Sequence, residues 1–94
     1  MDDNNKIIIE DLNEISSIPI DKLTLQYLTF CFHFNKLLSN SLDKIISLQY
    51  LKFGKKFNQQ LSNSLDKLTS LQHLTFNRDF NQLLSNSLDK LTSL

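Results

Sequence analysis

The chain has 94 residues, of which 40% are hydrophobic and 21% are charged, and its formal net charge is zero. A chain of this length forms one domain at most, and a zero net charge supplies no long-range field to attract nucleic acid or an anionic membrane. No apolar run approaches the ~20 residues that span a bilayer. Cys31 is the only cysteine, which excludes an internal disulfide and points to a reducing compartment. We therefore expect a cytoplasmic protein that contacts neither nucleic acid nor membranes.

The chain starts with a polar lead-in, residues 1–11, which carries four acidic side chains. A pattern of about 23 residues then recurs to the end, in units 12–33, 34–56 and 57–79 and a partial unit 80–94. The second and third units agree at 14 of 23 positions, and the partial unit agrees with the third at 14 of 15. Self-similarity at such a period predicts a solenoid of stacked units, whose first unit the lead-in would cap.

Apolar residues hold fixed positions in each unit. They are Phe34, Leu38, Leu42, Ile45, Leu48, Leu51 and Phe53 in the second unit, and residues of the same kind follow 23 positions later. The spacing of two at the end of this series is the strand period, and it predicts strands at Leu48–Phe53 and Leu71–Phe76. The preceding spacings of three suit 3₁₀ turns or short helices. The predicted class is a β-rich or α/β repeat solenoid with short parallel strands.

Two polar positions also recur at the unit period. Asn35, Asn58 and Asn81 would lie one above another, and hydrogen bonds between adjacent units would satisfy them. We interpret these residues as a structural Asn ladder, with a ligand-binding role as the alternative. The Asp-Lys neighbours at Asp43-Lys44, Asp66-Lys67 and Asp89-Lys90 are interpreted as a solvated outer face.

Between the inward Leu and Phe residues of each strand, alternate side chains point outward and differ from unit to unit. We take the following as candidate partner-binding residues: Tyr27, Thr29, Tyr50, Lys52, His73, Thr75 and Asn77. Variation on a constant frame would carry specificity in a repeat protein, although drift at solvated positions gives the same pattern. Lys52, Lys55 and Lys56 form a small basic cluster, which is either a contact for an acidic partner or a solvated face.

The partial unit ends where its strand would begin. The strand Leu71–Phe76 is therefore expected at a free sheet edge, whose unpaired N–H and C=O groups invite a partner strand or a second copy of the chain.

Residues for catalysis or metal binding do not converge in the sequence. Cys31 and His33 form a pair, and His73 is the only other histidine, whereas a zinc site normally needs four ligands. The single glycine, Gly54, excludes phosphate-binding and dinucleotide-binding fingerprints. We expect no enzyme activity, no metal and no cofactor.

The segment LTSLQHLTF at Leu68–Phe76 resembles the outline of leucine-rich repeats. More specifically, Phe-Asn followed by x-x-Leu-Ser-Asn-Ser-Leu-Asp-Lys-Leu-Thr-Ser-Leu-Gln-x-Leu-x-Phe resembles FNIP repeats, a leucine-rich-repeat-like family of social amoebae and giant amoebal viruses. Leu37, Gln60 and Leu83 stand where that family has proline. The resemblance implies leucine-rich-repeat-like coils that bind an unknown protein. If the chain is viral, the partner would be a host protein in the host cytoplasm.

The expected function is thus protein–protein interaction through the outward face of a short repeat sheet. The alternative is a truncated or decaying repeat protein without a specific activity, or one that completes its fold by strand pairing.

Overall fold

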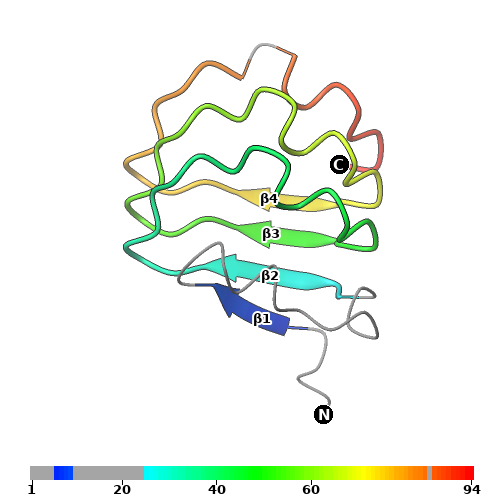
Figure 1. Ribbon diagram of the computed structural model, residues 1–94, viewed down its shortest axis with the longest axis horizontal. Helices are drawn as coiled ribbons and strands as arrows, with labels where there is room; N and C mark the ends of the chain where they lie inside the picture. Colours follow the sequence, from blue (N-terminus) through cyan, green and yellow to red (C-terminus); the bar gives the residue numbers. More distant parts are fainter. Residues whose placement is uncertain (1–5, 10–24, 85) are drawn as a thin grey trace.

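The computed structural model describes residues 6–9, 25–84 and 86–94. Figure 1 shows the short strands side by side in one sheet, and residues 31–49 and 53–72 return across one side of it between successive strands. The strands are β1 (Lys6–Ile9), β2 (Tyr27–Phe30), β3 (Tyr50–Lys52) and β4 (His73–Thr75). They follow the order β1-β2-β3-β4, and every neighbouring pair is parallel. The predicted parallel sheet is confirmed, and no helix occurs within the described ranges.

The sequence repeat sets the register of three of these strands. Tyr27 pairs with Tyr50, and Tyr50 pairs with His73, so each partner lies one 23-residue unit further along the chain. Both strands predicted from the spacing of two are present, although each is only three residues long. Strand β1 was not predicted; it lies in the lead-in and pairs Lys6 with Tyr27 outside the 23-residue period. Residues 10–24, which hold most of the first unit, are outside the described residues.

The entry to each strand repeats the same backbone contact. The carbonyl oxygen of Gln26 accepts hydrogen bonds from the N–H groups of Gln49 and Tyr50, both at 2.9 Å. We call each strand with the turns that follow it a layer. In the next layer, the carbonyl oxygen of Gln49 accepts hydrogen bonds from the N–H groups of Gln72 and His73 at 2.8 and 3.0 Å. Identical contacts at equivalent positions keep successive layers in the same register.

The period-three segments fold as separate turns, and the short helices allowed by the sequence do not form in the described residues. In the second unit, the N–H groups of Ser41, Asp43, Ile45 and Leu48 each donate to the carbonyl three residues earlier. A 3₁₀-helix needs such bonds at consecutive residues, and here they skip one or two positions. The left-handed φ of Ser39, 51°, further interrupts any helical path.

The core is built on two columns of stacked phenylalanine rings. Phe30, Phe53 and Phe76 stack at 5.1 and 5.4 Å between ring centroids, with interplanar angles of 3° and 2°. A second column, Phe34, Phe57 and Phe80, stacks at 6.1 and 6.0 Å. Each ring contact contributes about 0.5–1.5 kcal/mol beyond the burial of its area.

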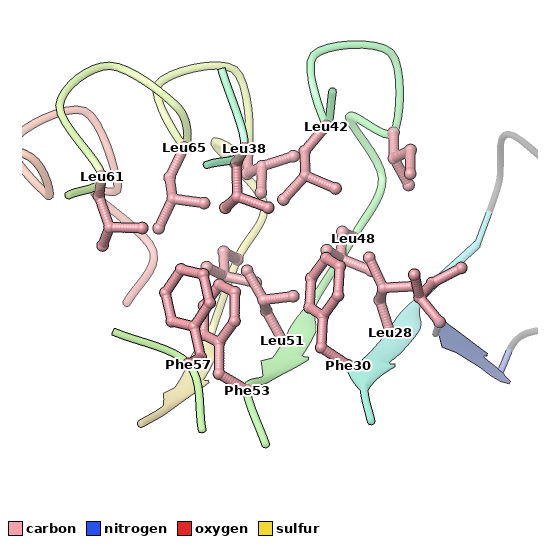
Figure 2. Packing of buried hydrophobic residues seen from close by; sticks show 14 of the residues in the cluster. Leu28, Phe30, Leu38, Leu42, Leu48, Leu51, Phe53, Phe57, Leu61 and Leu65 are labelled. Atoms are coloured by element: carbon pink, nitrogen blue, oxygen red, sulfur yellow. The ribbon is translucent and has the colours of Figure 1, made fainter. Parts of the chain in front are cut away.

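Leucine side chains from the turns close the core against these rings. Figure 2 shows Leu38, Leu42, Leu61 and Leu65 pointing from the return segments toward Phe53 and its neighbours on the sheet side. These leucines are at most 1% exposed. Burial decreases in the last layer, where Leu74, Phe76, Phe80, Leu84 and Leu88 are only partly buried. The sheet therefore has one face against the core and one face free to carry a site.

Candidate interaction surface

Three stacked rings cross the outward face of the sheet. The rings of Tyr27 and Tyr50 lie 4.3 Å apart at 11°, and those of Tyr50 and His73 lie 4.3 Å apart at 5°. Their positions are paired in register, and strands in a sheet are spaced by about 4.8 Å, so stacking follows directly from the fold. We call these three residues the ring row. The two tyrosines are half-buried and His73 is exposed.

A second row runs parallel to the first, two residues along each strand. It consists of Thr29, Lys52 and Thr75, which are also paired in register. The two rows flank a shallow hollow of about 220 Å³, whose walls include all six of these side chains. We call this hollow the ring groove. The structure therefore brings together six of the seven candidate partner-binding residues.

The seventh candidate, Asn77, lies beyond β4 and has a structural contact. Its Nδ2 donates a hydrogen bond of 3.1 Å to the carbonyl oxygen of Phe53 in the layer below. Asn77 does not line the ring groove, but it lines a second hollow that adjoins the groove.

This second hollow has a volume of about 500 Å³, and three cationic side chains contribute to its lining. It is lined by Thr29, Phe30, Cys31, Phe32, Lys52, Gly54, Lys55, Asn77 and Arg78. We call it the basic hollow. Thr29 and Lys52 line both hollows, so the two form one continuous surface. Of the lysine cluster identified in the sequence, Lys52 and Lys55 line the basic hollow, whereas Lys56 does not.

Gly54 lines the basic hollow, and steric contacts with neighbouring backbone require a glycine at this position. A Cβ at this position would overlap the carbonyl of Cys31 and lie 2.9 Å from the Cα of Phe32. Both obstacles are backbone atoms, so they cannot rotate away. The equivalent positions in the adjacent layers are Cys31 and Asn77, and all three residues line the basic hollow.

The three asparagines form hydrogen bonds between layers at the surface. The side-chain Oδ1 of Asn35 accepts from the backbone N–H of Asn58 at 2.8 Å, and Oδ1 of Asn58 accepts from the N–H of Asn81 at 2.8 Å. Each oxygen also accepts from a glutamine Nε2 at 3.0 Å, from Gln59 and Gln82 respectively. These glutamines were not predicted, although the repeated Phe-Asn-Gln at 57–59 and 80–82 was the available signal.

The sequence Ser-Asn-Ser recurs at 39–41, 62–64 and 85–87, and residues of these tracts line two further hollows of about 480 and 320 Å³ on the side of the turns. Ser62 and Asn63 contribute to both. Ser62 has a left-handed φ of 46°, as Ser39 does in the unit before. These hollows were not predicted, because serine is not a residue that signals left-handed backbone.

Within residues 6–9, 25–84 and 86–94, no group of three His, Cys, Asp or Glu side chains is placed to hold a metal ion. The single cysteine, Cys31, is a half-buried free thiol. A helix long and apolar enough to cross a membrane is not found in the part of the chain that the structure describes.

Comparisons with protein-family models, with curated proteins and with solved structures find no match for this chain. The resemblance to FNIP repeats therefore rests on the repeated motif alone.

Proposed function

We propose that this chain is an FNIP-type, leucine-rich-repeat-like solenoid that binds a protein partner through the outward face of its sheet. The 23-residue register between β2, β3 and β4 supports stacked repeats. The observation that carries the functional proposal is the ring row, because it places three aromatic rings in a line on the face opposite the core. Such rings are rigid and bury large areas when a partner covers them.

The ring groove suits a partner segment that crosses the strands. Its two walls differ in chemistry, since one is aromatic and the other carries hydroxyl groups and the ammonium group of Lys52. A surface already fixed by the core loses little side-chain freedom on binding, which favours affinity. We further propose that the protein acts in the cytoplasm, where the Cys31 thiol stays reduced, and that its role is binding rather than catalysis.

Quantitative affinity capture from amoebal cytoplasm tests this function. The bait is the wild-type chain, a groove variant with Tyr50→Ser, Lys52→Ser and His73→Ser, or a control variant with Lys44→Ser, Lys67→Ser and Thr69→Ser. The control residues are exposed and line neither the ring groove nor the basic hollow. Any captured protein is then purified, and its affinity for each chain is measured directly.

We expect the groove variant to bind the purified partner at least about ten-fold more weakly, while the control binds as the wild type does. Thermal melts of all three chains show whether they are folded. Loss of binding in both variants alike, or no partner that binds directly, would refute a role for the ring groove.

A second candidate function is strand addition at β4. In the described residues β4 pairs only with β3, and an apolar hollow of about 460 Å³ opens beside it, with Leu74, Phe76, Leu84 and Leu88 in its wall. A further repeat unit or a second copy would cover these side chains. Sedimentation velocity over a hundred-fold concentration range tests self-association, and a strictly monomeric chain at the highest concentration would exclude the second copy.

A further inference from the structure

The basic hollow is built from three columns of equivalent residues. The first column holds Thr29 and Lys52, the second holds Cys31, Gly54 and Asn77, and the third holds Phe32, Lys55 and Arg78. Members of a column are 23 residues apart and so belong to successive layers of the sheet. Gly54 removes a side chain from the middle of the central column. The three cationic side chains that line the hollow, Lys52, Lys55 and Arg78, belong to the two outer columns.

Its cations have no anionic partner within the described residues. No ion pair among residues 6–9, 25–84 and 86–94 involves Lys52, Lys55 or Arg78, and no carboxylate of these residues lines the basic hollow. Lys55 and Arg78 occupy equivalent positions of adjacent layers, and like charges so placed repel each other. An anion bound between them would relieve this repulsion.

The net charge of zero results from an uneven distribution of charged residues along the chain. Six of the ten acidic residues lie within the first 21 positions, whereas residues 25–94 carry eight Lys and Arg against four Asp. Three of those four, Asp43, Asp66 and Asp89, belong to the turns after the Ser-Asn-Ser tracts. The basic hollow thus lies in a part of the chain with an excess of positive charge.

One wall of the basic hollow is aromatic. Phe32 is 49% exposed, and the Nζ of Lys55 lies 5.5 Å from its ring centroid. The neighbouring backbone does not form a cradle for a bare phosphate, because the N–H groups of Phe34, Lys56 and Phe57 already donate to carbonyl oxygens of these loops. Carboxylates on apolar stems, with a chain that extends into the ring groove, fit this combination better than a free inorganic anion.

We propose that the basic hollow binds the carboxylate side chains of an acidic, extended peptide segment of the partner protein. The inference rests on the proposed function and deepens it, because it names the chemistry of the partner. Lys52 lines both hollows, so a segment with its acidic residues at Lys55 and Arg78 continues directly into the ring groove. Acidic side chains set the orientation of the segment, and the ring row provides the apolar contact.

Fluorescence anisotropy with labelled eight-residue peptides tests this specificity. The probes alternate tyrosine with glutamate, with glutamine or with lysine, and an eight-nucleotide oligothymidine serves as a second polyanion. The test variant is Lys52→Glu, Lys55→Glu and Arg78→Glu. The matched control is Lys44→Glu, Lys67→Glu and Lys90→Glu, which makes the same change in net charge on exposed turns outside both hollows.

We expect the glutamate probe to bind the wild-type chain more tightly than the other three probes. The test variant should weaken this binding by at least about ten-fold and the control by less than about two-fold. Binding should also fall in 1 M salt, where the screening length is about 3 Å. If the test variant does not fold, the neutral variant Lys52→Gln, Lys55→Gln and Arg78→Gln replaces it, with glutamine at the control positions as well.

Several results would overturn the inference. One is that the glutamate probe shows no binding up to about 1 mM. Others are that the test and control variants weaken its binding equally, or that the oligothymidine binds more tightly than the glutamate probe. Binding of the glutamine probe that depends on Tyr50 and His73, without preference for glutamate, would refute the basic hollow and leave the ring groove as the binding site. Glutamate binding that is insensitive to Tyr50→Ser and His73→Ser would instead refute the ring groove.

Discussion

At the scale of single residues, Gly54 shows how one position shapes both the fold and the surface. Its φ is not positive, so the backbone conformation itself does not demand glycine. The requirement is steric, because the main chain of Cys31 and Phe32 occupies the space of a Cβ. The sequence could not reveal the close approach of two backbones from different layers.

Gly54→Ala should therefore destabilise the chain, although alanine favours folding at most unstrained positions. Two backbone segments must separate to admit the methyl group, and we expect a loss of about 1–3 kcal/mol in the free energy of unfolding. Urea denaturation monitored by circular dichroism measures it. Lys56→Ala, at an exposed site in the same loop, is the control and should change stability by less than about 0.5 kcal/mol. Equal stability of the glycine and alanine chains would contradict the steric account.

Asn58 is the central residue of the asparagine ladder, and substitutions there test whether its side-chain oxygen stabilises the chain. Its Oδ1 accepts hydrogen bonds from the Asn81 N–H and from Gln82 Nε2. Asn58→Ala removes the acceptor and should cost about 1–2 kcal/mol, whereas Asn58→Asp keeps an oxygen in place and should retain most of the stability. The same denaturation experiment compares the two variants. If aspartate and alanine are equally destabilising, the acceptor oxygen is not what Asn58 contributes.

At the scale of elements, the sequence predicted the strands through their spacing of two, and the structure shortens them. Leu48–Phe53 contains β3 and Leu71–Phe76 contains β4, each as three paired residues. Strand β1 was not predicted, because its residues lie 21 rather than 23 positions before their partners in β2 and show no repeat motif. Alternation along the strands did place the six residues of the ring groove on one face. The basic hollow was not foreseen as a whole, because Phe32, Lys55 and Arg78 share a repeat position but not a residue type.

Stacking in the ring row predicts an energetic coupling between ring residues of neighbouring layers. Tyr50 and His73 stack directly, so a double-mutant cycle with alanine at both positions should give a coupling energy of about 0.5–1.5 kcal/mol. Tyr27 and His73 are separated by the ring of Tyr50, and the same cycle on that pair should give a value close to zero. Urea denaturation of the single and double variants provides both energies. Similar coupling in the two cycles would show that the rings do not act through direct stacking.

At the scale of the whole molecule, burial is uneven along the stack of layers. Phe53 and Phe57 in the middle are at most 1% exposed, whereas Phe76 and Phe80 in the last layer are only partly buried. In a solenoid, where each layer packs on its neighbours, stability is close to a sum of terms for adjacent layers. The last layer packs on one side only in this structure, so it should open most easily.

Hydrogen exchange measured by NMR tests this gradient. The N–H groups of Tyr50 and Phe53 bond to carbonyls of adjacent layers, at Gln26 and Thr75, and should exchange slowest. The N–H groups of Ser87 and Leu91 bond only within their own turn and should exchange at least about a hundred-fold faster after correction for intrinsic rates. The variant Phe80→Ala should widen this difference, because it removes a ring of the last layer together with its stacking contacts to Phe57 and Phe76. Uniform protection across all four amides would mean instead that the layers open together as a single cooperative unit.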